Sequence, residues 1–258
     1  MKILGIIPAR MNSSRFRGKP MAKILGIPMI GHCYLRSKMC KELSDLYVAT
    51  CDQEIFDYIQ SIGGKAIMTS KSHERATDRA AEAMLKIEKD YQFKFDAIVM
   101  IQGDEPMLDP KMISESFTPI INDEKIKVVN LMSEIDNDDE FNDPNEVKVV
   151  VNKRNEAIYF SREAIPSKKK YGNKITKLKQ VCIISFKRDY LIKFNEMPQT
   201  NLEIIESVDM MRVIENDEKV KMVLTVSKTW SVDTEEDLKK VEQKMLNDHL
   251  IKLYKSIE

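Results

Sequence analysis

Short apolar, β-branched runs alternate with longer helical patterns through the first half of this chain, and this alternation constrains the fold most strongly. Consecutive strands joined by helices are typical of βαβ units, in which the strands lie parallel. The first half therefore predicts an α/β fold with a mainly parallel central sheet. Strands are expected over residues 3–8, 46–50, 65–68 and 97–102, and helices over residues 28–41, 53–61 and 77–88.

Longer β-rich segments follow from about residue 127. We expect a smaller β-rich lobe at about residues 127–200, inserted in one domain that spans residues 1–258. Within this lobe, strands are predicted over residues 127–131, 147–151, 157–159 and 179–186. After it, the pattern predicts helices over residues 202–215 and 235–257, with a strand over residues 220–226 between them.

The charge balance excludes diffuse attraction to a polyanion, because 41 basic residues match 41 acidic ones in a chain of 258. We therefore expect no binding to nucleic acid. No run approaches the roughly 20 apolar residues that cross a bilayer, and the first residues lack the features of a secretory signal. These observations predict a cytoplasmic protein with no membrane association. The four cysteines have no Cys-x-x-Cys spacing, which favours buried free thiols over zinc or disulfides.

Two charged runs have ordinary interpretations. The run from Asp136 to Glu140 resembles a set of calcium ligands but lacks the glycine and the final glutamate of such a loop, so we expect a solvated acidic loop. The run Lys168-Lys169-Lys170 is either an exposed loop or a lid that gathers anions, and the exposed loop is favoured. His249 is predicted to lie on a helix surface or in packing, not to act as a ligand.

A basic segment follows the first strand. It places Arg10, Arg15, Arg17 and Lys19 within ten positions. In an open α/β sheet the loops beyond the carboxyl ends of the strands form the ligand crevice, and arginine forks and a lysine charge suit phosphate oxygens. The segment matches neither a P-loop nor a dinucleotide fingerprint. It predicts a phosphate-binding loop, with a merely solvent-exposed basic loop as the alternative.

Two acids occupy comparable positions. Asp104 follows an apolar strand in Gln102-Gly103-Asp104-Glu105-Pro106, and Asp233 lies in Ser231-Val232-Asp233-Thr234 between a strand and a helix start. Two such carboxylates could share one Mg²⁺ and leave its other positions to water and phosphate. Asp233 could instead cap the following helix without any metal.

The order of these motifs resembles the CMP-Kdo synthetases, the 3-deoxy-manno-octulosonate cytidylyltransferase family, over roughly the whole chain. The motifs that carry the resemblance are Pro8-Ala9-Arg10, Ser14-Arg15, Gly18-Lys19-Pro20, His73 with Thr77-Asp78-Arg79, Gln102-Gly103-Asp104-Glu105-Pro106, Tyr159-Phe160-Ser161-Arg162 with Pro166, and Val232-Asp233-Thr234 with Glu236-Asp237-Leu238.

This resemblance implies a Rossmann-like nucleotidyltransferase fold with a smaller dimerisation lobe, and a homodimer. It implies Mg²⁺-dependent transfer of a cytidylyl group from CTP to Kdo or a related acidic sugar, giving a CMP-sugar for lipopolysaccharide or capsule, and pyrophosphate. An acylneuraminate-type or other acidic-acceptor cytidylyltransferase, or a catalytically silent nucleotide-binding homologue, is the alternative.

The resemblance also implies roles for individual residues. Arg10, Arg15 and Lys19 would grip the triphosphate and, with Asp104, carry the catalysis, while Asp104 and Asp233 would hold Mg²⁺. The nucleotide would contact Pro8, Ala9, Arg10, Arg15, Lys19, Arg79 and Gln102, and the acceptor would contact Gln102, Tyr159, Arg162, Gln180, Ile184, Asp209 and Met210.

The expected acceptor pocket departs from the family pattern. Where the family usually has His-x-Gly-x-Tyr, this chain has Gln180-Val181-Cys182-Ile183-Ile184, and Glu-Gln-Leu-Arg is replaced by Asp209-Met210-Met211-Arg212. These changes remove hydrogen-bonding groups and leave a more apolar wall. Because unpaired polar groups govern discrimination strongly, they favour a different acceptor.

Overall fold

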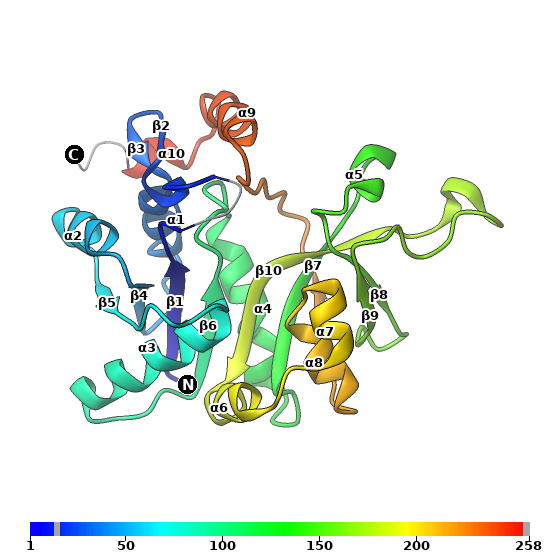
Figure 1. Ribbon diagram of the computed structural model, residues 1–258, viewed down its shortest axis with the longest axis horizontal. Coiled ribbons are helices and arrows are strands. Elements are labelled where there is room, and N and C mark those ends of the chain that lie inside the picture. Colours follow the sequence, from blue (N-terminus) through cyan, green and yellow to red (C-terminus); the bar gives the residue numbers. More distant parts are fainter. Residues whose placement is uncertain (13–15, 255–258) are drawn as a thin grey trace. The chain divides into compact units, whose positions relative to one another are not determined.

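The computed structural model describes residues 1–12 and 16–254, which divide into two compact units (Figure 1). The first unit comprises Met1–Ser114 and Lys228–Glu258, and the second comprises Glu115–Ser227. The lobe expected at residues 127–200 falls inside the second unit, and its role in dimerisation stays a prediction. No helix in the described part of the chain is long and apolar enough to span a membrane.

Four parallel strands form the sheet of the first unit, in the order β6, β1, β4, β5. Their bounds are β1 Ile3–Ala9, β4 Asp45–Thr50, β5 Ala66–Met68 and β6 Ala97–Ile101. The predicted α/β fold with a mainly parallel sheet is confirmed, and each predicted strand end differs from the observed end by one residue at most. Every residue of β6 is buried, as expected of a parallel strand covered on both faces.

Three helices pack on this sheet (Figure 1). α1 (Met29–Ser37) and α3 (Ala76–Tyr91) contact β1, while α2 (Gln53–Ser61) contacts β4 and β5. The helix predicted over residues 53–61 is confirmed at both ends, whereas α1 ends four residues before the predicted end at residue 41.

Two helices near the end of the chain pack against a hairpin near its beginning, within the first unit. The short strands β2 (Lys23–Ile24) and β3 (Ile27–Pro28) form a hairpin that packs with α9 (Glu235–Met245) and α10 (Ile251–Tyr254). Their shared apolar cluster contains Ile24, Ile27, Met29, Val232, Val241, Met245, Ile251 and Tyr254.

The single helix predicted over residues 235–257 is wrong. Helix α9 ends at Met245, and a turn precedes α10. In this turn Asp248 accepts a hydrogen bond from the Leu250 amide (3.1 Å) and forms an ion pair with Arg36, whose side chain is 1% exposed. A buried cation on α1 thus stabilises the break, which helical periodicity cannot reveal. His249 lies in this turn with its side chain 86% exposed.

A buried polar network joins α1 to α10. His32 Nε2 lies 2.9 Å from the Ile24 carbonyl oxygen, so Nε2 is the protonated nitrogen, and Nδ1 accepts the Tyr254 hydroxyl at 2.8 Å. Arg36 Nε donates to the same hydroxyl oxygen at 3.2 Å. One phenol therefore satisfies two buried groups.

Replacing Tyr254 by Phe should lower the free energy of unfolding by about 1–3 kcal/mol, because His32 and Arg36 would each lose a buried partner. Urea denaturation measures the change. Tyr171→Phe, at a side chain that is 63% exposed, is the matched control and should leave stability unchanged. Equal stability of the two variants would contradict this prediction.

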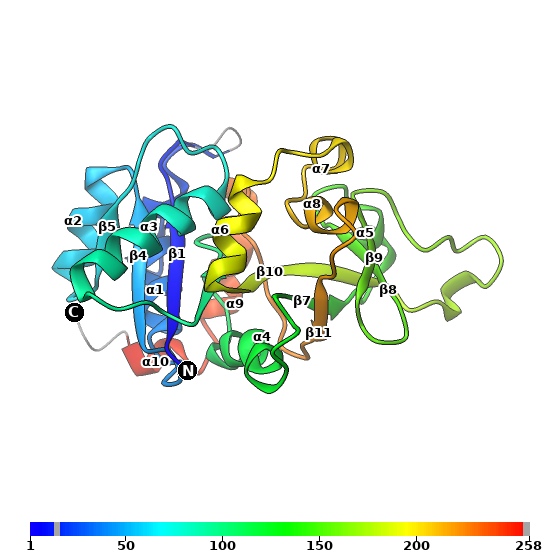
Figure 2. The ribbon, with the colours of Figure 1, turned by 90° about the horizontal axis from the view of Figure 1, so that it is seen from below.

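The second unit is built around β7 (Val128–Glu134), which pairs in parallel with β11 (Lys221–Leu224) and antiparallel with β10 (Leu178–Lys187). Strand β8 (Lys148–Val151) pairs antiparallel with β10 and with β9 (Ala157–Ser161). The helices of the segment between β6 and β11 are α4 (Pro110–Asn122), α5 (Asp138–Asn142), η2 (Gly172–Lys174), α6 (Arg188–Glu196), α7 (Asn201–Glu206) and α8 (Met210–Glu215). Figure 2 shows α6, α7 and α8 on one side of β7 and β10.

The helix predicted over residues 202–215 is wrong as a single element. It breaks after Glu206, where Ser207 adopts a left-handed conformation (φ 53°), and α8 begins at Met210. Glu203 of α7 and Arg212 of α8 form two buried contacts across the break, at 2.6 and 2.7 Å. This ion pair stabilises two short helices in place of one long helix.

The acidic run also differs from its predicted form. Residues 138–142 form α5, which Asn137 caps by accepting the Glu140 amide at 2.8 Å, whereas we expected a solvated loop. Asp138 pairs with Lys168 (2.8 Å) and Lys177 (2.7 Å). Acids in the first turn favour the helix because the positive end of the helix dipole lies there, and the two lysines add ion pairs from distant segments.

Candidate active site

A cavity of about 340 Å³ lies at the carboxyl-terminal edge of the first unit's sheet. Parallel strands end at the same edge, so segments far apart in the sequence meet there. The lining residues are Pro8, Ala9 and Arg10 at the end of β1, Lys19 and Pro20 of η1 (Lys19–Met21), residues 73–76 and Arg79 at the start of α3, Gln102, Gly103 and Asp104 after β6, and Asp233 before α9.

An ammonium group lies between two carboxylates in this cavity. Lys19 Nζ is 2.8 Å from Asp104 Oδ2 and 3.2 Å from Asp233 Oδ1. Asp104 and Asp233 thus contact the same ammonium group, and Asp233 does not cap α9, because Thr234 is the N-cap. Burial lowers the pKa of Lys19, but the two carboxylates outweigh it and raise the pKa above its ordinary value of 10.5. Lys19 is therefore charged at neutral pH.

The backbone around Lys19 is held at both ends of the basic loop. The Met11 amide donates to Asp52 Oδ2 at 2.8 Å, and the Gly18 amide donates to the Met11 carbonyl oxygen at 3.0 Å. Gly18 has φ 75°, a left-handed conformation that glycine adopts without steric cost. The loop thus closes on itself and starts η1 at Lys19.

The Asp104 segment passes close to other backbone groups. A Cβ at Gly103 would lie 3.0 Å from the Pro8 carbonyl oxygen, so glycine permits this approach of the segment to β1. The Val232 amide donates to the Asp104 carbonyl oxygen at 2.9 Å, which joins the two acidic segments directly.

Arg36 is a supporting residue that sequence reasoning missed. Its Nη1 donates to the carbonyl oxygens of Met107 (3.2 Å) and Leu108 (3.3 Å), just after the Asp104 segment. Its position among apolar residues of a predicted helix was the one available signal, because an arginine there must find buried acceptors.

The two acids have the chemistry of a divalent-cation site. Asp104 Oδ1 is buried and accepts no hydrogen bond from the residues that the structure describes, and carboxylate oxygens are ligands that Mg²⁺ prefers. Among the described residues no group of three or more His, Cys, Asp or Glu side chains could hold a metal ion. A cation here would take its remaining ligands from water or a bound phosphate.

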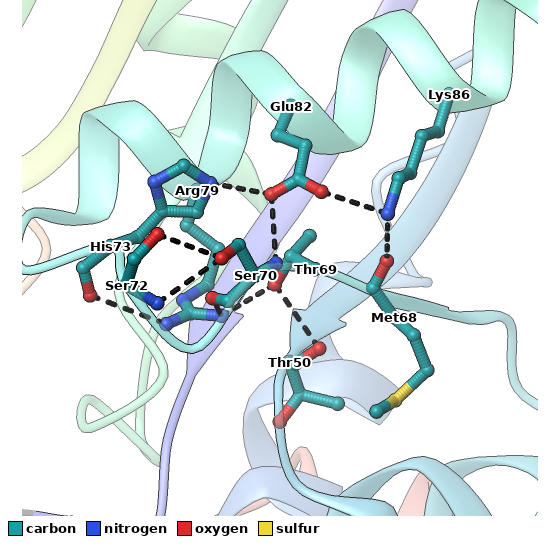
Figure 3. Close-up of polar contacts among 9 residues, drawn as sticks. All are labelled: Thr50, Met68, Thr69, Ser70, Ser72, His73, Arg79, Glu82 and Lys86. Carbon is teal, nitrogen blue, oxygen red and sulfur yellow. Dashed lines mark hydrogen bonds and ion pairs between the residues drawn. The ribbon is translucent and has the colours of Figure 1, made fainter.

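A second wall of the cavity is a loop that Arg79 supports from beneath (Figure 3). Arg79, which is 3% exposed, donates to the Thr69 hydroxyl and to the carbonyl oxygens of Ser70 (3.3 Å) and His73 (3.5 Å). Thr69 in turn donates to the Thr50 carbonyl oxygen at the end of β4 (3.1 Å). These contacts favour a positioning role for Arg79, and its predicted contact with a nucleotide stays a prediction.

Glu82 secures the outer side of the same loop (Figure 3). It accepts the Ser70 amide at 2.8 Å, pairs with Lys86 at 2.8 Å and contacts His73 Nε2. Partial burial raises the pKa of Glu82, but Lys86, the Ser70 amide and His73 together lower it from 4.5 to about 2. Glu82 therefore stays ionised in the folded protein at any ordinary pH.

The remaining predicted residues of the first unit occupy the same cavity with one exception. Pro8, Ala9 and Gln102 line its wall, and Arg10 is exposed there without an ion pair to any residue that the structure describes. Arg15 lies outside the described residues. The nucleotide contacts assigned to this group stay predictions.

Apart from Gln102, the predicted acceptor residues lie in the second unit. Tyr159 donates to Glu206 Oε1 at 3.0 Å and the Arg162 amide donates to Glu206 Oε2 at 2.8 Å. Sequence reasoning missed Glu206, because nothing along the chain connects it to β9. The structure thus brings Tyr159 and Arg162 together through one carboxylate.

The side chains at the positions that depart from the family pattern offer few hydrogen-bonding groups to an acceptor. Gln180 donates to Asn130 Oδ1 at 2.6 Å. Ile184 is 4% exposed and Met210 is fully buried, while Asp209 is half-buried at the N-cap of α8. Their contact with an acceptor stays a prediction.

The ionised state of Glu82 predicts how the stability of the loop depends on pH. Its pKa is lower in the folded chain than in the unfolded one, so its stabilisation is complete above 4.5 and disappears as the pH falls towards 2. Glu82→Gln should lower the free energy of unfolding by about 1 kcal/mol at neutral pH, and the difference from the original protein should vanish in acid. Denaturation curves at several pH values measure it, with exposed Glu134→Gln as the control. A gap that does not change with pH would contradict this prediction.

Known proteins resemble the chain over nearly its whole length. The cytidylyltransferase family matches residues 4–220. The 3-deoxy-manno-octulosonate cytidylyltransferase of Fusobacterium nucleatum subsp. nucleatum is 42% identical over 93% of this chain and 96% of that protein. The enzyme of the same description from Geobacter metallireducens is 38% identical over 95% and 98%.

A solved structure agrees with these relatives. The structure of CMP:2-keto-3-deoxy-manno-octonic acid synthetase complexed with CTP superposes with a TM-score of 0.87 at 36% identity and covers 95% of this chain and 99% of that one. The chain belongs to the cytidylyltransferase family, among the 3-deoxy-manno-octulosonate cytidylyltransferases.

Proposed function

We propose that this enzyme transfers the cytidylyl group of CTP to a hydroxyl of 3-deoxy-manno-octulosonate (Kdo), releasing pyrophosphate. The Lys19 ammonium between Asp104 and Asp233, in a cavity that Arg10 also lines, is the observation that supports this reaction most directly. The relatives named for this activity, and the related structure complexed with CTP, supply the nucleotide and the acceptor.

The chemistry requires positioning and charge neutralisation more than a covalent intermediate. The acceptor hydroxyl attacks the α-phosphorus in line while pyrophosphate leaves, and negative charge spreads over the phosphate oxygens. Some of the basic residues that line the cavity lie at the start of α3. Among the other described lining residues, the cations are Lys19 and Arg10. We propose that they bind the triphosphate, and that Arg15 joins them.

Asp104 and Asp233 would hold Mg²⁺, as the free buried oxygen Asp104 Oδ1 and the pair's shared cation suggest. When bound, this ion would neutralise phosphate charge and make the acceptor hydroxyl more acidic. Asp104 is held by its own backbone contact with Val232, so the two carboxylates need little rearrangement to act together.

The nucleotide base is proposed to lie against the cavity walls away from Asp104 and Asp233. The loop of residues 73–76 and Gln102 provide backbone and amide groups there. Arg79 and Glu82 would act through the loop that they stabilise. Exclusion of water from this cavity would strengthen each electrostatic contact with the phosphates.

A related acidic sugar is the second candidate acceptor. It is favoured by the loss of hydrogen-bonding groups where the family usually provides them: the Gln180 side chain already donates to Asn130 Oδ1, and Ile184 and Met210 are apolar and buried. A polyhydroxylated acid finds few partners at such positions, so the enzyme could prefer an acid with fewer or differently placed hydroxyls. Assembly as a homodimer stays a prediction.

Asp104→Asn should reduce turnover about a hundredfold or more, because a carboxylate that holds the catalytic cation contributes several kcal/mol to transition-state stabilisation. The amide oxygen can still accept from Lys19, so the fold should persist. The measurement is pyrophosphate release from CTP with Kdo, N-acetylneuraminate and other acids. Asp90→Asn, on the exposed end of α3, is the matched control and should retain full activity.

Release of pyrophosphate only with acids other than Kdo would establish the second candidate. No release with any acid, or an Asp104→Asn variant as active as the original protein, would contradict the proposed reaction.

A further inference from the structure

The position of Lys19 has a consequence for metal binding. Its ammonium contacts one oxygen from each carboxylate, at 2.8 and 3.2 Å, and these carboxylates are the groups proposed above to hold Mg²⁺. We propose that Lys19 is the internal counterion of the Asp104–Asp233 pair in the nucleotide-free enzyme, and that it competes with a divalent cation for the same carboxylate oxygens. This inference deepens the proposed function and rests on its use of a divalent cation.

Burial makes a counterion necessary. The Lys19 side chain is 11% exposed, and the side chains of Asp104 and Asp233 are 23% and 25% exposed. Two carboxylates that contact one atom repel each other, and water screens this repulsion poorly at a partly buried site. The single charge of Lys19 cancels half of their combined charge, so the cluster is stable without a metal.

A metal ion alone gains little from this cluster. It would meet the positive charge of Lys19, and the described residues add no third acid, histidine or cysteine to a metal-binding group. A bound triphosphate changes both conditions, since its oxygens can complete the coordination of the ion and also pair with the displaced ammonium. Lys19 should therefore make metal binding and triphosphate binding depend on each other.

The local backbone allows such a displacement. Lys19 begins η1, where Gly18 and Met11 close the loop and the Ala22 amide donates to the Lys19 carbonyl oxygen at 3.1 Å. Only the flexible four-carbon side chain has to turn. The two segments that carry the carboxylates stay joined, because the Val232 amide donates to the Asp104 carbonyl oxygen.

Binding of Mn²⁺ in the absence of nucleotide tests this inference, with the electron paramagnetic resonance signal of the free ion as the readout. Lys19→Met should bind Mn²⁺ about tenfold or more tightly than the original protein, because the competing charge is gone. Lys23→Met, at an exposed lysine of β2, is the matched control and should not change the affinity. Adding Asp104→Asn to Lys19→Met should abolish the gain, which assigns the ion to this pair.

A second variant separates the effect of losing the charge from any effect of misfolding. Lys19→Gln is also uncharged but can donate hydrogen bonds to the carboxylates, and it should show the same tighter binding. Mn²⁺ should raise the melting temperature of both variants more than that of the original protein. Unchanged or weaker Mn²⁺ binding in the folded variants would overturn the inference.

This experiment uses neither CTP nor an acid. Tighter Mn²⁺ binding without cytidylyl transfer would therefore support the role of Lys19 and count against the proposed function alone.

Discussion

Opposite charges that meet at one edge of a parallel sheet are the interaction on which this site depends. Lys19 is 85 residues from Asp104 and 214 residues from Asp233 along the chain, yet one ammonium contacts both. Each of these charges is largely or partly buried and is stabilised by the opposite charge that it contacts. The site is therefore a property of the folded unit and not of any one loop.

Around this cluster, side chains hold the backbone of the segments that carry the functional residues. Asp52 and Met11 close the basic loop, Arg36 binds the carbonyl groups that follow the Asp104 segment, and Arg79 supports the loop of the opposite wall. Each support is a buried or partly buried hydrogen bond to backbone, which limits movement more than a contact between two flexible side chains does. The cavity can thus present charged groups to a polyanion without large rearrangement of the sheet.

In the second unit, several charged side chains contact other groups of the same unit. Glu203 and Arg212 join two short helices, Glu206 joins Tyr159 to Arg162, and Lys148 donates to three backbone carbonyl oxygens. These polar groups are satisfied within the unit. An acceptor that binds there must therefore either use the few groups with spare hydrogen-bonding capacity or displace an existing contact, and this requirement limits which acids suit the enzyme.

Much of the first unit follows from the sequence alone. Short apolar runs locate β1, β4, β5 and β6 within one residue. Burial on both faces explains the continuous runs of β1 and β6, whereas β5 is only partly buried. The basic loop and the two acids could also be selected from the sequence as candidates, because charged residues follow the ends of predicted apolar strands there. The chain order of several motifs also identified the family.

Only the tertiary structure decided which groups act on one another. The breaks at Ser207 and around Asp248 interrupt continuous helical patterns, because each is favoured by an ion pair that periodicity cannot show. Glu203 pairs with Arg212 across a break inside one predicted helix, and Asp248 pairs with Arg36 of a distant helix. The supporting roles of Arg36 and Glu206 depend on distant carbonyl and hydroxyl groups in the same way. Sequence determines the residues and the local elements, whereas the pairing of buried charges is decided by three-dimensional proximity, since electrostatic energy depends on distance in space and not on distance along the chain.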